Sequence, residues 1–530
     1  MRLLQEWLTR QAQSRSDAPA LHWKGKTVTY GELERQANRL AWMLVRQGCA
    51  RGDRVALLLP KGPLAIASML AVLKADCSYT PLDPQNPATR IARVLGALEC
   101  RCVLAVASTG ELLLNAFQQL RDAALPVPSV GLLEPEIDPV ACGARFGLDD
   151  VAACPGEPPP SRNGSQDPAH ILFTSGSTGA PKGVVITHAN VIHFVEWAVR
   201  YFGMGPTDRV SGHSPLHFDL STFDIYGTLA AGATLYPIPH EANLLPHKLA
   251  LLIEDAGLTQ WFSVPSILNH MAKLDVVRPG AFPSLRRLLW CGERFPTSGL
   301  MYWMRRLPQV EFTNLYGPTE TTIASSYYRV PSCPQDEREE IPIGQGCDGE
   351  ELLVLDAELR SSAREEIGDL YIRGPGLSPG YWRDPARTAA AFIPDPFSNR
   401  PGDRLYRTGD LAKVDGQGRI VLLGRADSQV KSRGYRIELG EIEAALDGIA
   451  ELQESAVVAV GSDGFEGSLL CCAYVPRPGG EVAPTILRQR LAEVVPSYML
   501  PSRWKRLDRL PLNQNGKTDR PALRELWLDP

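Results

Sequence analysis

The chain has 530 residues, more than one hydrophobic core usually supports, so at least two domains are expected. Hydrophobic residues make up 44% and charged residues 22%, an ordinary globular balance, and the net charge of -5 excludes the basic field that nucleic-acid binding requires. Eleven cysteines without the paired spacing of a zinc site are typical of free thiols in a reducing cytoplasm, so a cytoplasmic protein is expected.

Helical and strand patterns alternate along the chain. Residues 1–15 interrupt their apolar positions with charged and amide side chains, which predicts an amphipathic helix and not a signal peptide. Residues 31–48 predict a longer helix. Its apolar positions recur near a 3.6-residue period at Leu33, Ala37, Leu40, Ala41, Leu44 and Val45. Short apolar runs at 54–60, 370–374 and 419–424 predict buried strands. The alternation indicates an α/β fold with helices on sheet faces, and no apolar run is long enough to span a membrane.

Composition also indicates where the chain divides. Residues 154–168 are rich in proline, glycine and polar side chains, which predicts a surface linker. After residue 427 the sequence changes to a smaller, more charged module. We therefore expect a large N-terminal domain of several helix-flanked sheets, residues 1–426, and a small α+β C-terminal domain, residues 427–530.

One loop stands out for its chemistry. The sequence ILFTSGSTGAPKGV, residues 171–184, places an apolar run before a series of hydroxyl residues and glycines, and Lys182 follows them. Backbone N–H groups and hydroxyls in such a loop can converge on an anion, and the lysine adds a positive charge. The loop lacks the spacing of a Walker A motif. A flexible surface turn is the alternative for a single Ser/Gly loop of this kind.

Nine further windows, in a consistent order, bear on that alternative. The windows are VTYGEL (28–33), LKADCSYTPLDP (73–84), HFDLSTFDIYG (217–227), NLYGPTETTIASS (314–326), GDLYIRGPGLSPGYW (368–382), YRTGDL (406–411), GRADSQVKSRGYRIELGEIE (424–443), VPSYMLP (495–501) and NQNGKTDR (513–520). Together with the loop they resemble the adenylate-forming superfamily, and more narrowly a stand-alone amino-acid adenylation enzyme of nonribosomal peptide synthesis. Asp76, where the family usually has glycine, and Ser432, where an apolar residue is usual, depart from the pattern at peripheral positions.

The resemblance implies a two-step reaction with ATP and Mg²⁺. A carboxylate attacks the α-phosphorus of ATP to give an acyl-adenylate and pyrophosphate, and a thiol then takes the acyl group and releases AMP. Positioning and charge neutralisation dominate such a displacement. The implied catalytic residues are Lys517, Glu320 and Thr319, with Glu320 as the Mg²⁺ ligand. The implied ATP contacts are Thr174, Ser175, Gly176, Ser177, Thr178, Gly179, Lys182, Gly292, Tyr316, Asp410 and Arg425.

The resemblance also implies a moving C-terminal domain. Lys517 would bridge the attacking carboxylate and the α-phosphate in one domain orientation only. Asp427 matches the hinge residue, and rotation about it would withdraw Lys517 and present the segment KSRGYRIELGE, residues 431–441, for thioester formation. Taken singly, each matched residue has an ordinary structural alternative, such as a solvated lysine or carboxylate.

The substrate class depends on Asp219, which matches the family's partner for an α-ammonium group. An ordinary helix N-cap is the alternative for an aspartate at this place. The remaining pocket positions are uncharged: Leu220, Phe223, Ser266, Leu289, Cys291, Leu315, Ile323 and Ala324. Because an unpaired charge is costly to bury, a small neutral amino acid is expected, namely alanine, serine, cysteine, proline or a relative.

The expected partner is a separate carrier protein bearing phosphopantetheine, since no carrier segment follows Lys517. The need for a small helper protein is left open. Two rival functions remain at this point. An acyl-CoA ligase on the same fold is disfavoured by Asp219 and the NGKTDR ending. An inactive nucleotide-binding scaffold predicts loss of Lys517, Glu320 or Asp410, and all three are present.

Overall fold

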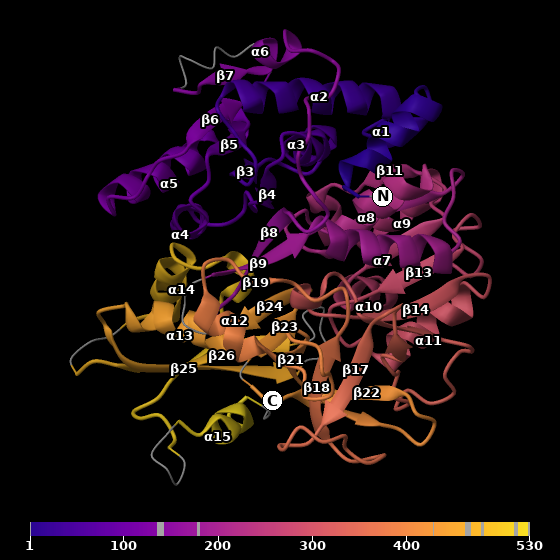
Figure 1. The fold of residues 1–530 in the computed structure, drawn as a ribbon. Coiled ribbons are helices and arrows are strands. Elements are labelled where there is room, and N and C mark those ends of the chain that lie inside the picture. The colour runs from indigo at the N-terminus through magenta and orange to yellow at the C-terminus, as the bar shows by residue number, and fades with distance from the viewer. Residues whose placement is uncertain are drawn as a thin grey trace.

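The computed structural model describes residues 2–134, 143–176, 181–427, 429–461, 468–478, 482–512 and 518–527. Within these ranges the chain forms a large N-terminal domain with three sheets and a small C-terminal domain (Figure 1). The predicted α/β class is confirmed. In Figure 1 the C-terminal elements, in orange and yellow, lie beneath the indigo and magenta N-terminal region.

Two large sheets carry most of the N-terminal domain. The first has, among the described residues, the strand order β16 (Gln345–Gly346), β15 (Ser326–Arg329), β14 (Glu311–Tyr316), β13 (Arg287–Trp290), β12 (Gln260–Ser263), β10 (Arg209–Gly212), β11 (Thr234–Pro237), β1 (Pro19–Trp23) and β2 (Lys26–Thr29). The second has the order β19 (Gly380–Tyr381), β9 (Lys182–Thr187), β8 (Pro168–Thr174), β4 (Ser78–Pro81), β3 (Arg54–Leu58), β5 (Cys102–Ala105), β6 (Ser129–Leu132) and β7 (Phe146–Gly147). The strands at the centre of each sheet are parallel, which requires crossover helices on the faces.

A third, antiparallel sheet follows in the chain. It pairs β17 (Glu351–Leu355), β18 (Gly368–Arg373), β21 (Arg404–Val414) and β20 (Phe392–Pro394), and β22 (Ile420–Arg425) pairs with β21. The strands predicted at 54–60, 370–374 and 419–424 are β3, β18 and β22, so these predictions are confirmed.

The C-terminal region after residue 428 is built separately. It contains the hairpin β23 (Gln429–Ser432) and β24 (Tyr435–Glu438), and a sheet of β25 (Leu452–Gly461), β26 (Ser468–Pro476) and β27 (Arg503–Arg506). Its helices are α13 (Leu439–Asp447), α14 (Pro484–Ala492), the 3₁₀ turn η4 (Ser497–Met499) and α15 (Arg520–Glu525). These elements enclose their own hydrophobic cluster, which includes Ile442, Leu446 and Leu491.

Helices cover the sheets of the N-terminal domain. They are α1 (Gln5–Ser14), α2 (Tyr30–Arg46), α3 (Pro63–Lys74), α4 (Ala88–Leu98), α5 (Gly110–Asp122), α6 (Leu148–Ala152), α7 (His188–Tyr201), α8 (Leu220–Ala231), α9 (Pro246–Asp255), α10 (Pro265–Lys273), α11 (Thr297–Arg306) and α12 (Pro385–Ala391), with 3₁₀ turns η1 (Ala107–Thr109), η2 (His240–Leu244) and η3 (Thr319–Thr321). None of the helices in the described ranges is long and apolar enough to cross a membrane.

The helix predicted over 31–48 shows how local sequence sets these elements. It is α2, and a capping box fixes its start because the Glu32 N–H donates to Thr29 Oγ1 at 3.2 Å and the Thr29 N–H donates to Glu32 Oε2 at 2.8 Å. The predicted apolar face is buried except at Val45, which is 39% exposed because it lies in the last turn. The helix predicted over 1–15 is α1.

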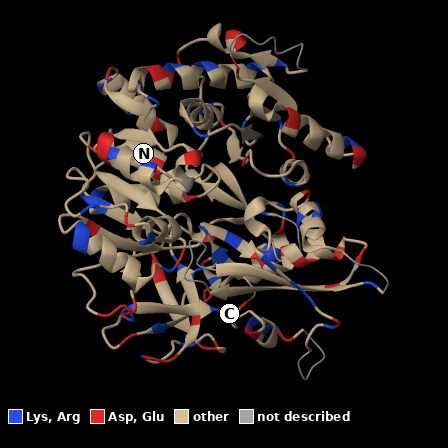
Figure 2. Cartoon of the chain, turned by 180° about the vertical axis from the view of Figure 1, so that it is seen from behind, with Lys and Arg blue, Asp and Glu red and all other residues tan. Residues whose placement is uncertain are grey.

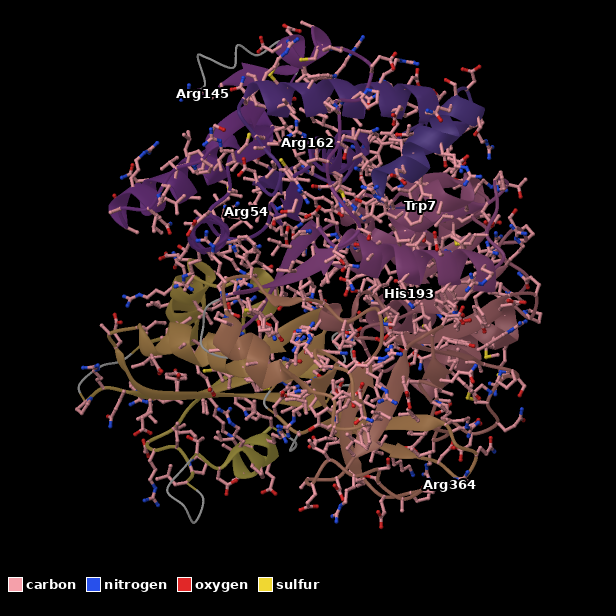
Figure 3. The ribbon with its side chains drawn as sticks, in the orientation of Figure 1. Trp7, Arg54, Arg145, Arg162, His193 and Arg364 are labelled. Atoms are coloured by element: carbon pink, nitrogen blue, oxygen red, sulfur yellow. The ribbon has the colours of Figure 1, made fainter. Side chains whose placement is uncertain are left out.

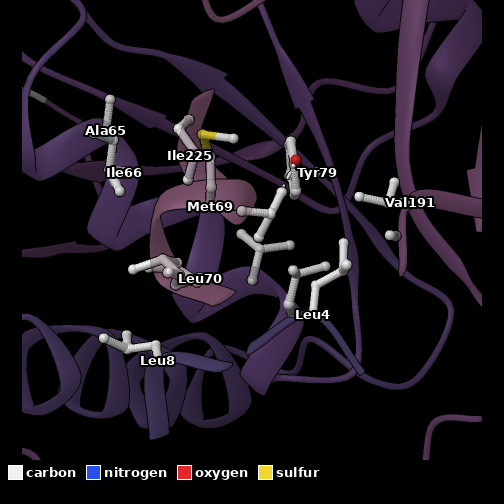
Figure 4. Close-up of a cluster of buried hydrophobic side chains, with 14 of the residues drawn as sticks. Leu4, Leu8, Ala65, Ile66, Met69, Leu70, Tyr79, Val191 and Ile225 are labelled. Atoms are coloured by element: carbon white, nitrogen blue, oxygen red, sulfur yellow. Dashed lines mark hydrogen bonds between the residues drawn. The ribbon is translucent and has the colours of Figure 1, made fainter. Parts of the chain in front are cut away.

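The largest core joins the two main sheets through α3 and α8. Figure 4 shows side chains of α3 against Ile225 of α8, with Leu8 of α1, Tyr79 of β4 and Val191 of α7 around them. The labelled members are Leu4, Leu8, Ala65, Ile66, Met69, Leu70, Tyr79, Val191 and Ile225. Figure 3 places Trp7 in the upper part of the molecule, His193 near its middle and Arg364 at the third sheet. Acidic and basic residues are interspersed over both domains in Figure 2.

Candidate active site

A strand pair holds the ends of the hydroxyl-rich loop. β8 and β9 are antiparallel, and their register pairs Thr174 with Lys182, so the loop leaves and returns at one place. Thr174 Oγ1 is buried without a hydrogen-bond partner among the described atoms, which fits a hydroxyl that binds a ligand oxygen such as that of a phosphate. The predicted contacts Ser177, Thr178 and Gly179 lie outside the described residues.

The C-terminal domain contacts this loop directly. Ser175 Oγ donates to the backbone carbonyl of Arg436 in β24 at 2.6 Å, and the Gly176 N–H donates to Glu441 Oε2 in α13 at 3.3 Å. Glu441 also forms a buried ion pair with Arg90 of α4. The predicted segment 431–441 is therefore the part of the C-terminal domain that faces the loop.

Glu320 lies at the centre of the site, in η3 just after β14. Its side chain is 0% exposed, and three groups converge on its carboxylate. Lys182 Nζ lies 3.1 Å from Oε1, Tyr381 OH donates to Oε1 at 2.8 Å, and Arg436 Nη1 donates to Oε1 at 2.9 Å and to Oε2 at 2.7 Å. Burial acts to raise the pKa of Glu320, but the Arg436 and Lys182 cations outweigh it and hold that pKa far below its ordinary value.

The predicted nucleotide-binding residues form a second polar cluster beside the first. Tyr316 OH donates to Asp410 Oδ2 at 2.5 Å, and Arg425 Nη1 donates to Asp410 Oδ1 at 2.9 Å. Arg425 also binds Asp427 through Nε at 2.8 Å and Nη2 at 2.6 Å. The Lys431 ammonium lies 5.7 Å from the centre of the Tyr316 ring. The structure thus brings the ring, the two-oxygen acceptor and the predicted hinge residue together.

Asp219 lies at the N-cap position of α8, but its side chain does not make the usual capping hydrogen bond to the first turn. The Thr319 hydroxyl and the backbone of Leu220, the first residue of α8, both favour the charged form of the carboxylate. The residue is 8% exposed. Burial raises the pKa of Asp219 to about 6, against an ordinary value of 3.8. A buried carboxylate with a raised pKa is well suited to receive a cationic ligand.

Seven of the eight other predicted pocket residues belong to one buried cluster. They are Leu220, Phe223, Leu289, Cys291, Leu315, Ile323 and Ala324. Burial raises the pKa of the Cys291 thiol to about 12, so it stays neutral. Ser266 is the second residue of α10, and its Oγ is buried without a partner among the described atoms. Gly292, next to Cys291, has a φ of +95° that favours glycine.

Sequence reasoning did not single out four residues at the site. Arg436 and Lys431 were present only as members of the predicted segment 431–441. Tyr381 lies in the SPGYW window, and Glu293, whose Oε1 accepts from the Gly434 N–H at 2.7 Å, follows Cys291 and Gly292. The motif windows indicated that these residues lie near the site. They could not show which residues each one contacts, because the contacting residues are distant in the sequence. Lys517, the predicted catalytic lysine, lies outside the described residues.

A metal at this site would need most of its ligands from a substrate. In the described part of the chain no group of three or more His, Cys, Asp and Glu side chains could hold a metal ion. Glu320 and Thr319 offer hard oxygen atoms, which fit Mg²⁺ bound mainly by phosphates and water. Arg436 covers the Glu320 carboxylate in this structure.

Family comparisons agree with this geometry. The model of the AMP-binding enzyme family matches residues 8–382, and that of the AMP-binding enzyme C-terminal domain matches residues 441–517. The chain belongs to the AMP-binding enzyme family. The resemblance to nonribosomal peptide synthetase adenylation domains is confirmed.

Individual relatives match almost the whole of this AMP-binding enzyme. Phosphinothricin tripeptide synthetase PhsB of Streptomyces viridochromogenes is 37% identical over 97% of the chain, and tyrocidine synthase 3 of Brevibacillus parabrevis is 34% identical over 98%. The chain spans 41% and 8% of the lengths of these two proteins.

Solved structures show the same fold. The Vibrio cholerae adenylation domain AlmE, in complex with glycyl-adenosine-5'-phosphate, has a TM-score of 0.84 at 26% identity over 99% of this chain and 98% of its own. The amide bond synthetase McbA of Marinactinospora thermotolerans has a TM-score of 0.85 at 26% identity over 99% of both chains.

Proposed function

We propose that this AMP-binding enzyme activates a small neutral amino acid as its aminoacyl-adenylate and transfers it to the phosphopantetheine thiol of a carrier protein. The observation that carries the proposal is the buried, uncapped Asp219 carboxylate next to a pocket of uncharged residues. A substrate ammonium would complete an ion pair there, whereas a second charge on the substrate side chain would stay unpaired.

In the first half-reaction a carboxylate oxygen of the amino acid bonds to the α-phosphorus of ATP, and the bond from that phosphorus to the β-phosphate oxygen breaks. Thr174 and Lys182 would hold the departing phosphates, and Asp410 would accept the ribose hydroxyls. Mg²⁺ on Glu320 would neutralise phosphate charge. Lys517 would stabilise the charge that develops between the reactants.

In the second half-reaction the carrier thiol attacks the acyl carbonyl carbon, loses its proton, and AMP leaves. We propose that the C-terminal domain turns about Asp427 between the two steps. The placement of residues 431–441 at the site supports the orientation for thioester formation.

Amino-acid-dependent exchange of labelled pyrophosphate into ATP tests the proposal. The twenty proteinogenic amino acids, together with fatty and aryl acids, should be compared. We expect exchange with one or a few small neutral amino acids, and its loss in Asp219→Ala and Lys517→Ala. Exchange only with acids that lack an amine, followed by thioester formation with free CoA, would replace this proposal with an acyl-CoA ligase. Nucleotide binding without exchange would favour a scaffold.

Relatives add support for the carrier. Holo-PA1221, whose structure has a TM-score of 0.79 at 26% identity over 98% of this chain and 84% of its own, is described as a nonribosomal peptide synthetase protein with adenylation and PCP domains. Loading of a carrier protein is therefore the second assay, with mass spectrometry of the phosphopantetheine arm as the measurement.

A further inference from the structure

The contacts of Arg436 connect the two domains at the most buried charge of the site. Arg436 belongs to β24 of the C-terminal domain, and its guanidinium reaches both carboxylate oxygens of Glu320 in the N-terminal domain. The side chains are 17% and 0% exposed. We call this arrangement, with Ser175 and Gly176 contacting Arg436 and Glu441, the docked orientation.

In the docked orientation Arg436 supplies a counter-charge to the buried Glu320 carboxylate. A buried ionised group is strongly unfavourable without a partner. Lys182 and Tyr381 both contact Oε1 of Glu320 and belong to the N-terminal domain, so they remain when the C-terminal domain turns. Among the described residues, Oε2 accepts a hydrogen bond from Arg436 at 2.7 Å. Departure of Arg436 would expose Oε2 to a different cation.

A metal ion and Arg436 would compete for this carboxylate. Arg436 Nη1 donates to both oxygens of Glu320, at 2.9 and 2.7 Å, so the guanidinium occupies the side on which the two oxygens converge. A divalent cation on the same carboxylate would be repelled by the guanidinium charge at this short range. The docked orientation also uses the Ser175 hydroxyl and the Gly176 N–H, which are the expected phosphate contacts.

We propose that Arg436 is a positioning residue that replaces the metal on Glu320, so that docking of the C-terminal domain and binding of metal–pyrophosphate exclude each other. The domain then docks once the metal–pyrophosphate product has left. The inference rests on the proposed metal role of Glu320 and the proposed rotation about Asp427, and it does not depend on which amino acid is activated.

The test measures docking and metal binding without any amino acid or carrier. Fluorophores on non-canonical residues at the exposed positions Asn115, in α5, and Gln453, in β25, report domain orientation by energy transfer. Binding of Mn²⁺–pyrophosphate is followed by electron paramagnetic resonance. In the wild type, Mg²⁺–pyrophosphate should shift the energy transfer away from its docked value, whereas pyrophosphate with EDTA should shift it much less.

Arg436→Ala should lose the docked signal and bind Mn²⁺–pyrophosphate about ten-fold more tightly, as expected if docking withholds about nine-tenths of the wild-type molecules from the metal. Arg436→Lys keeps one positive charge, so its docked signal and its affinity for Mn²⁺–pyrophosphate should lie between those of the wild type and Arg436→Ala. Arg488→Ala removes a positive charge from α14, where Arg488 donates to the Pro501 carbonyl, and should behave as the wild type.

A merely structural role for Arg436 predicts the opposite result. Metal–pyrophosphate would then bind equally or more weakly to Arg436→Ala, in a variant whose thermal melt matches that of Arg488→Ala, and the proposal would be overturned. Wild-type protein that binds no metal–pyrophosphate would also overturn it, together with the proposed role of Glu320. A wrong substrate assignment would change neither measurement.

Discussion

At the scale of single residues, Asp219 combines burial with an acid–base property that can be measured. Its pKa in the folded protein, about 6, lies above its ordinary value of 3.8, because burial disfavours the charged form. A raised carboxyl pKa costs the folded state progressively more as pH rises from about 4 to about 6, and the full cost persists above that range. Asp219 therefore lowers the stability of the unliganded protein at neutral pH.

We expect Asp219→Asn to raise the free energy of unfolding at pH 8 by about 3 kcal/mol, since one pKa unit corresponds to about 1.4 kcal/mol. At pH 4 the gain should nearly vanish. Urea denaturation at the two pH values gives the measurement. An equal gain at both values would show that the carboxylate charge is not its cause.

The same ionisation should govern substrate binding. The amino-acid KM of the wild type should rise as pH falls below about 6, because protonated Asp219 cannot pair with an ammonium. Pyrophosphate exchange across pH 5 to 8 tests this, and the KM for ATP is the internal control. Parallel changes in the two KM values would point to a general effect of pH.

Glu320 gives a second prediction at this scale. Glu320→Gln leaves the Lys182 and Arg436 cations without their counter-charge, so the free energy of unfolding should fall by about 3 kcal/mol. Tyr381→Phe is the matched control, because it removes one hydrogen bond to the same oxygen and should cost about 1 kcal/mol. Equal losses in the two variants would contradict a role for charge.

At the scale of elements, Asp76 shows how a departure from the family pattern acquires a structural role. It follows α3 with a φ of +57°, where glycine is the usual residue. Its carboxylate accepts hydrogen bonds from Ser161 Oγ at 2.6 Å and from the Arg162 N–H at 2.6 Å. The carboxylate thus ties the predicted linker 154–168 to the second sheet.

Substitutions at Asp76 separate these two effects. Both Asp76→Gly and Asp76→Ala should release the linker from the carboxylate. Glycine accepts the positive φ at this position, whereas alanine keeps it unfavourable. Asp76→Ala should therefore be less stable than Asp76→Gly by about 1 kcal/mol. Both variants should be cleaved faster than the wild type within 155–163 in limited proteolysis. Unchanged cleavage would rule out the tether.

The elements were predictable where their information is local. The capping box at Thr29 and the apolar period set α2, and short apolar runs set β3, β18 and β22. Motif windows predicted Glu320 and Lys182 as site residues, and the structure brings their side chains to within 3.1 Å. The partner of Glu320 was not predictable, because Arg436 is 116 residues away and only the docking of two domains brings it close. Local patterns also could not show that the Asp219 side chain leaves α8 uncapped.

At the scale of the whole molecule, the proposed hinge decides whether one chain performs both half-reactions. Asp427 lies between β22 and β23, and its carboxylate accepts from Arg425 and from the Gln429 N–H at 3.0 Å. Asp427→Pro restricts the backbone torsion there. Overall carrier loading should fall at least about ten-fold, while one half-reaction stays within a few-fold of the wild type.

Two assays make that comparison, pyrophosphate exchange for adenylation and single-turnover transfer from preformed aminoacyl-adenylate for thioester formation. Asp427→Ala, which keeps the torsion free, is the control. Equal losses of both half-reactions in the proline variant would contradict a hinge at this residue.

The interface between the domains also limits how such enzymes can be recombined. A chimaera joined at residues 426 and 427 would keep each hydrophobic core intact, because the C-terminal elements have a cluster of their own. It would nevertheless replace one side of the pairings that join the domains, among them Arg436 with Glu320, Glu441 with Arg90, and Gly434 with Glu293. A transplanted C-terminal domain should therefore be chosen for its match at these three places before its overall identity is considered.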